Sequence, residues 1–242
     1  MAGCMALLLS SQPLKAQETF REMQYSPQST VFTLNAPSRP TLRLYRAGRG
    51  GKQYKKMKMK QVGDNRWSIE VKGDLKGVFY TFDIGRGETP GVFAKAVSCN
   101  GGRAAVVDMR DTNPAGWEND RRLTTKSMAD LVLYELHHRD FSIDPSSGLV
   151  NKGKFLALTE KKALTLKTLG ITHVHLLPMY DFGFTDESRS HPQYNWGYDP
   201  LNYNVPEGSY SFDAELPTRR ILEFKQMVQA LHQAGIRVVL DV

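Results

Sequence analysis

Between residues 26 and 109, short runs of alternating apolar and polar residues are separated by glycine, proline and asparagine. The runs are STVFTLNAP, TLRLYRAG, RWSIEVKG, GVFYTFDIG and RAAVVDM. A period of two is typical of strands that bury one face, and frequent turn residues are typical of antiparallel sheets. We therefore predict an all-β, immunoglobulin-like sandwich over residues 26–109.

The pattern changes after residue 109. Residues 110–129 are polar and contain proline and glycine, which predicts a linker between two domains. The following stretch, DLVLYELHHRDF, is mostly apolar from Leu131 to Leu136. An apolar run of this length is typical of a parallel strand that is buried on both faces.

Two helices and two more strands are predicted after this strand. Helical spacing of apolar residues indicates one helix from Thr159, its N-cap, to Leu169, and another from Thr218 to Ala234. The runs ITHVHLLP and IRVVLDV predict the strands. The order β-α-β-α-β indicates a parallel sheet.

An open doubly wound sheet and a (β/α)8 TIM barrel both fit this order of elements. No glycine-rich phosphate loop follows the first strand, which disfavours a dinucleotide-binding sheet. Polar residues at the carboxyl ends of all three strands favour the barrel, where the site lies on that face. Residues 130–242 are therefore predicted to hold the first three βα units of a barrel, and the chain as a whole is predicted to be multidomain.

Composition and charge exclude some classes of protein. Hydrophobic residues make up 40% and charged residues 24%, as in ordinary globular proteins, and no stretch approaches the roughly 20 apolar residues of a membrane-spanning helix. The net charge is +7, with a basic run from Arg43 to Lys60. From Lys56 to Lys60, lysine alternates with Met57 and Met59, which favours a solvated sheet face over a nucleic-acid site.

The first residues, MAGCMALLLSSQPLKA, resemble the end of a secretory leader. Residues 1–25 are predicted to be a leader remnant and a disordered start, which suggests secretion or a periplasmic location and leaves the cytoplasm open. The two cysteines, Cys4 and Cys99, provide no disulfide framework, because Cys4 lies in this segment.

A long aromatic loop is predicted between the second strand and the second helix, from Tyr180 to Pro217. Its segment 193–211 should form neither a good helix nor a clean strand. A sugar ring offers C–H faces for aromatic stacking and hydroxyls for polar partners, so the composition suits a carbohydrate-facing loop as well as one anchored by its rings. The rings are Tyr194, Trp196, Tyr198, Tyr203 and Tyr210, and the polar partners are Asn195, Asp199, Asn202 and Asn204.

The run YNWGYDPLNYNVPEGSYS resembles the signature of type I pullulanases, debranching enzymes of the alpha-amylase superfamily in glycoside hydrolase family 13. YELHHRDFSID resembles the first barrel strand of that family, and EFKQMVQALHQAGIRVVLDV resembles the elements that lead into its first shared region. The predicted sandwich resembles the starch-binding module, of carbohydrate-binding family 48, that precedes the barrel. The resemblance covers residues 26–242.

This resemblance implies cleavage of alpha-1,6 branch linkages in pullulan, starch or glycogen by a retaining double displacement. It also implies an alpha-glucan polysaccharide or oligosaccharide as partner, with no nucleic acid. Tyr198 matches the tyrosine beneath the sugar at the cleavage point, and Asn195, Trp196 and Asp199 match the residues that shape this subsite. Asp241 matches the aspartate that supports the hydrogen-bond network of the site.

The resemblance places the nucleophile, the acid/base and a further aspartate on later barrel strands, downstream of Val242. No catalytic residue is therefore expected within the chain, which is predicted to be an inactive N-terminal fragment. Asp181, Asp186, Glu187 and Asp199 are predicted to be polar loop residues, since nothing in their spacing fixes a catalytic pair.

The histidines are predicted to be structural. His173 and His175 alternate with apolar residues in a strand and lack a third metal ligand, so no metal site is expected. His137 and His138 either border the site or support it. No cofactor is predicted, and the sequence leaves calcium open. The alternatives are a non-catalytic alpha-glucan-binding protein and another debranching, branching or trehalose-releasing member of the superfamily.

Overall fold

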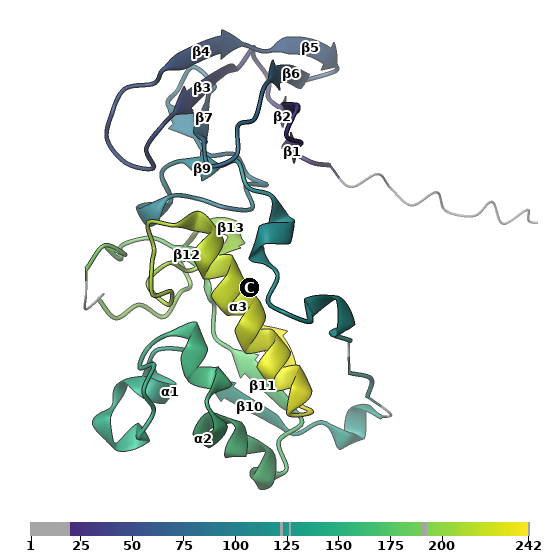
Figure 1. The fold of residues 1–242 in the computed structure, drawn as a ribbon, viewed down its shortest axis with the longest axis vertical. Helices are drawn as coiled ribbons and strands as arrows, with labels where there is room; N and C mark the ends of the chain where they lie inside the picture. The colour runs from purple at the N-terminus through teal and green to yellow at the C-terminus, as the bar shows by residue number, and fades with distance from the viewer. Residues whose placement is uncertain (1–19, 122, 126, 190–192, 242) are drawn as a thin grey trace, which may run out of the picture.

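The computed structural model describes residues 20–121, 123–125, 127–189 and 193–241 (Figure 1). The predicted leader remnant, residues 1–19, lies outside the described residues. The predicted disordered start is wrong for its last residues, because strand β1, Met23–Tyr25, pairs with the next strand and places Met23 opposite Phe32.

Two antiparallel sheets form the first part of the chain. One sheet has the order β1-β2-β6-β5, with β2 at Ser29–Asn35, β5 at Lys60–Gly63 and β6 at Arg66–Lys72. In the other, β3, Thr41–Tyr45, lies between β4, Lys55–Lys58, and β7, Phe79–Asp83. The short strands β8, Glu88–Thr89, and β9, Ala104–Ala105, both pair with β7.

The two sheets pack face to face around an aromatic core. The Phe32 ring of β2 lies 4.9 Å from the Tyr80 ring and 6.5 Å from the Phe82 ring of β7, between centroids. All three side chains are fully buried, as expected when the inward positions of two sheets interdigitate. The prediction of an all-β first part is confirmed.

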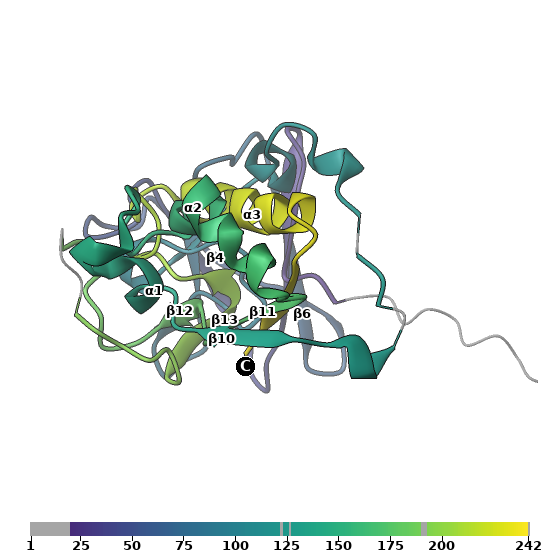
Figure 2. The ribbon, with the colours of Figure 1, turned by 90° about the horizontal axis from the view of Figure 1, so that it is seen from below.

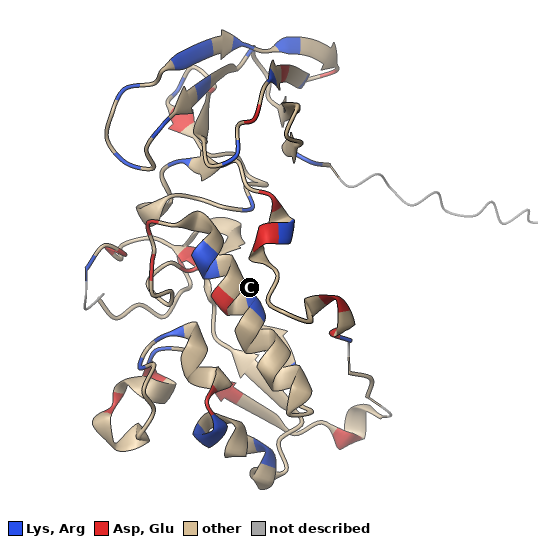
Figure 3. Ribbon diagram, viewed as in Figure 1, with Lys and Arg blue, Asp and Glu red and all other residues tan. Residues whose placement is uncertain are grey.

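The lysines from Lys56 to Lys60 are exposed and the methionines between them are at least half-buried, as predicted. Met59 is fully buried and Met57 is half-buried, whereas Lys56, Lys58 and Lys60 are exposed. Figure 3 shows lysine and arginine along the outer strands β4 and β5. The lysines from Lys56 to Lys60 therefore lie on the solvent side of two edge strands, β4 and β5, whereas Met59 between these strands belongs to the core.

The predicted linker holds three short 3-10 turns, Met109–Thr112, Trp117–Asn119 and Met128–Asp130. The segment runs along helix α3, Pro217–Gln233. Lys225 of the helix donates to Thr112 Oγ1 at 2.8 Å and to Asn113 Oδ1 at 2.7 Å. These contacts attach the segment to the second part of the chain.

Three parallel strands form the sheet of the second part, in the order β10, Leu133–Leu136, β11, His173–Leu176, and β14, Arg237–Leu240. The strands place Glu135 beside His175 and His175 beside Val239. The β-α-β-α-β parallel unit is observed, and the complete barrel stays a prediction.

Helices cover one face of this sheet (Figure 2). Met227 and Leu231 of α3 are fully buried in one core with Val174 and Leu176 of β11. Helix α3 lies within one residue of its predicted bounds at each end. It begins with Pro217, whose fixed φ suits the first helical turn, and the chain turns away at Gly235, which has a left-handed φ of 73°.

Strand β10 is more exposed than predicted. Leu133, Tyr134 and Glu135 are exposed, and only Leu136 is buried. The prediction of burial on both faces is wrong, because the helices lie on one face of the sheet and β10 pairs only with β11 among the described residues.

The helix predicted from Thr159 to Leu169 is also wrong in detail. The chain forms a 3-10 turn at Phe155–Thr159, the short helix α2 at Lys161–Leu164 and a second 3-10 turn at Thr165–Leu169. Thr159 ends the first turn, and its hydroxyl donates to the Leu156 carbonyl at 2.8 Å. Thr165 and Thr168 make the same bond to the residue three positions earlier, and such bonds compete with regular helix.

The remaining elements lie after β10 and after β11. Helix α1, Asp140–Ile143, and the 3-10 turn Pro145–Ser147 follow β10, whereas β12, Tyr180–Phe182, and β13, Pro200–Pro206, follow β11. Within the described part of the chain, every helix is too short or too polar to cross a lipid bilayer.

Candidate functional site

The aromatic segment forms one strand of a hairpin. β13 pairs antiparallel with β12 through two register shifts, with Asn202 opposite Asp181. Residues 200–206 form an irregular strand, which agrees with the expectation of no clean strand. The sequence did not indicate the pairing itself, because the partner strand lies beyond a loop and a local pattern does not reveal it. The pairing buries Asn202 and leaves Leu201 and Tyr203 exposed.

Tyr198 and Asp241 lie together at the carboxyl end of the parallel sheet. The Tyr198 hydroxyl donates to Asp241 Oδ2 at 2.7 Å, and this bond raises the pKa of the tyrosine. Asp241 directly follows β14, so the end of a strand fixes one side of the contact. The tyrosine ring remains 55% exposed and is free to meet a ligand.

Asn195 holds the backbone that carries Tyr198. Its side-chain amide donates to the Gly183 carbonyl at 2.8 Å and to Asp199 Oδ2 at 3.3 Å, and its Oδ1 accepts the Gly197 N–H at 2.8 Å. The structure therefore places Asn195 as a brace within the loop. Asp199 is half-buried beside it, with a buried Oδ1 that has no hydrogen-bond partner among the described residues.

Gly197 is required at its position. Its φ is 89°, in the left-handed region, and a Cβ there would lie 2.3 Å from the Pro178 carbonyl oxygen. No other residue type fits this close approach without moving the backbone. The loop that carries Tyr198 thus packs directly on the chain leaving β11.

Aromatic rings of the segment divide into exposed and buried ones. Trp196 and Tyr203 are about as exposed as Tyr198, whereas Tyr210 is 3% exposed and packs on the Phe155 and Phe182 rings. Tyr210 is therefore a core residue and not a surface for sugar. A small pocket of 160 Å³ lies beside Tyr198, and its lining residues are Pro178, Tyr180, Gly197, Tyr198, Pro200 and Tyr203.

The two histidines after β10 have different environments. The His137 Nε2 donates to the Asn195 carbonyl at 2.8 Å, so His137 borders the loop. His138 is 1% exposed between the rings of Phe155 and Tyr210, and burial lowers its pKa to about 3. His138 is thus a neutral core residue.

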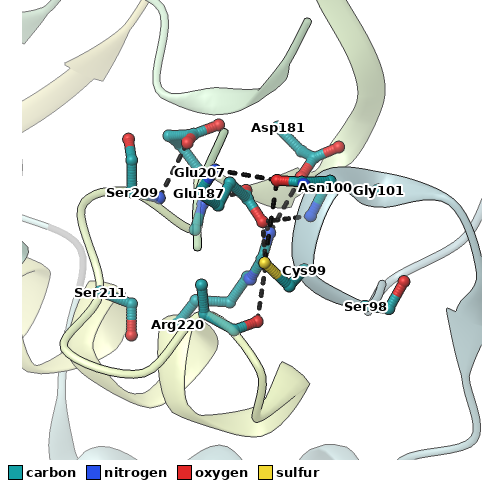
Figure 4. A network of polar contacts seen from close by, with 12 residues as sticks. Ser98, Cys99, Asn100, Gly101, Asp181, Glu187, Glu207, Ser209, Ser211 and Arg220 are labelled. Atoms are coloured by element: carbon teal, nitrogen blue, oxygen red, sulfur yellow. Dashed lines mark hydrogen bonds and ion pairs between the residues drawn. The ribbon is translucent and has the colours of Figure 1, made fainter. Parts of the chain in front are cut away.

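A buried cluster of charged residues lies behind the hairpin (Figure 4). Arg220 of α3 is fully buried and donates to Asp181 Oδ1 at 2.9 Å and to Glu187 Oε2 at 2.8 Å. Glu207 accepts the backbone N–H groups of Phe182 and Ser209. The prediction that Asp181 and Glu187 are merely polar loop residues is wrong, because α3 brings a guanidinium against them.

Burial dominates the electrostatics of this cluster. It raises the pKa of Asp181 to about 7 and that of Glu207 to about 8, and the neighbouring Glu187 carboxylate adds to both shifts. Arg220 opposes them. Three carboxyl groups surround one guanidinium, and partial protonation reduces the charge that must stay out of water.

Comparison with known proteins gives a consistent result. The chain is 38% identical over 237 residues to the pullulanase of Bacillus subtilis, a match covering 90% of this chain and 32% of that protein. The structure of Paenibacillus barengoltzii pullulanase complexed with maltohexaose and alpha-cyclodextrin superposes with a TM-score of 0.87 at 45% identity, covering 91% of this chain and 37% of that one. Bacillus acidopullulyticus pullulanase matches with a TM-score of 0.85 at 40% identity, covering 91% of this chain and 29% of that one.

The chain belongs to the pullulanase family. It spans about a third of the length of the Bacillus subtilis pullulanase, and the match to chloroplastic pullulanase 1 of Arabidopsis thaliana, at 36% identity, covers 20% of that protein. No protein-family model matches the chain. The agreement therefore concerns one part of the pullulanases.

The structure groups two further residues near the loop that carries Tyr198: Glu135, which sequence reasoning missed, and His175, which it interpreted as structural for want of a third ligand. Glu135 of β10 and His175 of β11 have donor atoms within 4.8 Å of each other and of Asp241. Parallel register explains the grouping, since Glu135 lies beside His175 and Asp241 is two residues beyond Val239. The three strands were predicted from the sequence, but the grouping of these side chains could be predicted only with the register between the strands.

The donor atoms of Glu135, His175 and Asp241 are of types that bind divalent metals. Asp241 already accepts a hydrogen bond from Tyr198. His173 is buried, and its ring nitrogen contacts the Thr172 hydroxyl at 2.8 Å, so the two histidines do not share a site.

Proposed function

We propose that this chain binds alpha-glucan through the Tyr198 surface and is part of a pullulanase that cleaves alpha-1,6 branch linkages with retention. The observation that carries the proposal is the hydrogen bond from the exposed Tyr198 to Asp241 at the end of β14. It presents a ring for stacking beside a carboxylate for sugar hydroxyls. Pullulanase structures complexed with maltohexaose and with maltotriose support the choice of ligand.

Binding is tested by isothermal titration with maltotriose and by electrophoresis in gels that contain glycogen. Tyr198→Ala removes the stacking ring and should weaken binding about tenfold. Tyr198→Phe keeps the ring, so it should lose less. Tyr54→Ala is the control, because Tyr54 is an exposed tyrosine of the β-sandwich. A loss in Tyr54→Ala with none in Tyr198→Ala would move the glucan site to the sandwich.

For this chain alone we propose no hydrolytic activity. In the family that it resembles, the nucleophile and the acid/base follow the fourth and fifth barrel strands, and three parallel strands are described here. The carboxylates to test as a substitute pair are Glu135 and Asp241, since a retaining pair needs a separation of about 5 Å.

The activity test is the release of reducing sugar from pullulan by the purified chain. We expect none above that of the double variant Glu135→Gln, Asp241→Asn. Activity that this double variant abolishes would refute the proposal. Glucan binding without activity would equally fit the alternative, a non-catalytic alpha-glucan-binding protein, which the exposed rings of Trp196, Tyr198 and Tyr203 favour.

Location is a separate proposal. The leader-like start suggests that the protein is exported to the periplasm or the medium. Mass spectrometry of the mature N-terminus from the native host would test this, since an intact Met1 would refute export by a cleaved leader.

A further inference from the structure

A turn of the β-sandwich touches the loop that carries Tyr198. The 3-10 turn Cys99–Gly101 lies against the hairpin and α3 (Figure 4). The Asn100 backbone N–H donates to Glu187 Oε2 at 2.7 Å, and Asn100 Oδ1 accepts the Glu187 N–H at 2.8 Å. The Asn100 amide also donates to Asp186 Oδ1 at 3.2 Å. One residue thus makes three hydrogen bonds to a segment 86 to 87 residues away.

The backbone of Asn100 is suited to this contact. Its φ is 63°, in the left-handed region, where asparagine is tolerated better than most residues. The next residue, Gly101, packs so closely that a Cβ would lie 2.5 Å from Asp181 Oδ2. The Gly101 carbonyl accepts a hydrogen bond from the buried Asn202 at 3.3 Å. The turn is therefore shaped to fit the hairpin.

The contact with Asn100 is connected to Tyr198 by the backbone and by hydrogen bonds. Asp186 and Glu187, which Asn100 contacts, directly follow residues 183–185 in the chain. Asn195 bonds to the Gly183 carbonyl, and its amide nitrogen lies 3.5 Å from Thr185 Oγ1. Asn195 also accepts the N–H of Gly197, the residue before Tyr198. Two parts of the loop, residues 183–187 and 195–199, are thus linked to each other, and the sandwich holds the first of them.

Other residues join the sandwich part to α3. Ala96, Ala105 and Val107 form a small apolar cluster with Ile221 of α3. The salt-bridged cluster around Arg220 lies within the second part. The Asn100 side chain bonds to Asp186 and Glu187 of the loop and, within its own turn, accepts a weak bond from Cys99 Sγ at 3.8 Å. It is not part of the apolar cluster around Ile221, so its loss should change the orientation of the loop more than the attachment of the two parts.

We propose that Asn100 is a positioning residue, through which the β-sandwich orients the loop that carries Tyr198 at the sugar site. The role in sugar binding rests on the function proposed above, whereas the effect on the loop does not. A sugar surface held from outside its own domain loses less conformational entropy on binding, so the sandwich raises affinity without touching the sugar.

The test uses Asn100→Gly in the whole chain. Glycine keeps the left-handed φ and removes only the side-chain amide. Hydrogen exchange should become about tenfold faster at the backbone amides of residues 195–199, and maltotriose affinity should fall about tenfold, from the loss of one bond to the Glu187 N–H and one to the Asp186 carboxylate. Strand amides of β2 and β6 should keep their protection.

Two further variants complete the design. Asn65→Gly is the matched control, since Asn65 also has a left-handed φ, of 51°, and lies in the β-sandwich turn between β5 and β6. Asn100→Asp retains an acceptor for the Glu187 N–H but faces two carboxylates. Its exchange at residues 195–199, compared with that of the wild-type chain at the same pH, should be faster at pH 7 and return toward the wild-type rate near pH 4, where the new carboxyl protonates.

The outcomes separate the two proposals. Unchanged exchange at residues 195–199 in Asn100→Gly, or an equal change in Asn65→Gly, would overturn the positioning role. Absence of maltotriose binding by the wild-type chain would refute the proposed function, and the exchange data would still decide the role of Asn100.

Discussion

Arg220 is the fully buried cation on which the charge balance behind the hairpin depends. It lies against Asp181 and Glu187 and also donates to the carbonyls of Pro206 and Ala214. A buried ion pair contributes little net stability, but removal of one partner leaves the other charge uncompensated. The main effect of losing Arg220 on stability should therefore come from leaving the buried Asp181 and Glu187 carboxylates without a counter-charge.

Arg220→Met should lower the free energy of unfolding by about 3 to 5 kcal/mol, measured by urea denaturation. Arg110→Met is the control, because Arg110 is exposed and its surface pair with Asp108 should contribute little to stability. Similar losses in the two variants would contradict the assigned role of Arg220.

At the scale of elements, sequence patterns predicted an element well where its own residues determine its ends and its buried face. The apolar face of α3 is regular and its ends carry Pro217 and Gly235, so its bounds were predicted within one residue. Around residues 159–169 the threonine hydroxyls changed the outcome, because they bond to the backbone in place of a helical pattern. Spacing alone does not show which of the two sets of bonds forms.

The candidate site was predictable in part. Tyr198 and Asp241 could be chosen by resemblance, but their direct contact depends on how the loop folds onto the strand end. The Arg220 cluster was not predicted, since its four charged residues are distributed from 181 to 220 and meet only when α3 packs on the hairpin. Long-range pairing of this kind leaves no local period in the sequence.

Strand β14 has an outer edge without a strand partner among the described residues. Three of its four residues, Val238, Val239 and Leu240, are apolar, and unpaired apolar edges promote association between chains. Val239→Lys places a charge on the half-buried face of this edge and should reduce light scattering by concentrated protein. Val92→Lys is the control, because Val92 is an exposed valine outside the described strands. Equal reduction by both would indicate a general effect of net charge.

At the scale of the whole molecule, Asp181 and Glu207 connect stability to pH. Both pKa values are raised by burial above their ordinary values, to about 7 and about 8. A group whose pKa is raised on folding stabilises the fold below its unfolded pKa, and that contribution is lost as the pH rises through the folded value. Glu187, Arg220 and Lys154 are the charged groups nearby.

The free energy of unfolding should therefore fall by about 2 kcal/mol between pH 6.5 and pH 8. This window limits the opposite contribution of His138, whose lowered pKa affects stability mainly below its ordinary value of 6.5. Urea midpoints across the window measure the effect. Glu207→Gln should flatten the upper part of the curve, and a wild-type stability that rises with pH there would refute the charge assignment.

Cys99 lies in the turn that touches the hairpin, next to Asn100, and it is 1% exposed. Burial raises the pKa of its thiol to about 12, and the carboxylates of Glu187 and Glu215 add to the shift. The thiolate is the form that reacts with alkylating reagents, so the closed structure protects this cysteine twice, by access and by protonation. Alkylation at Cys99 would therefore proceed mainly from molecules in which the turn has separated from the hairpin. The rate of Cys99 alkylation would therefore report how often the β-sandwich separates from the hairpin.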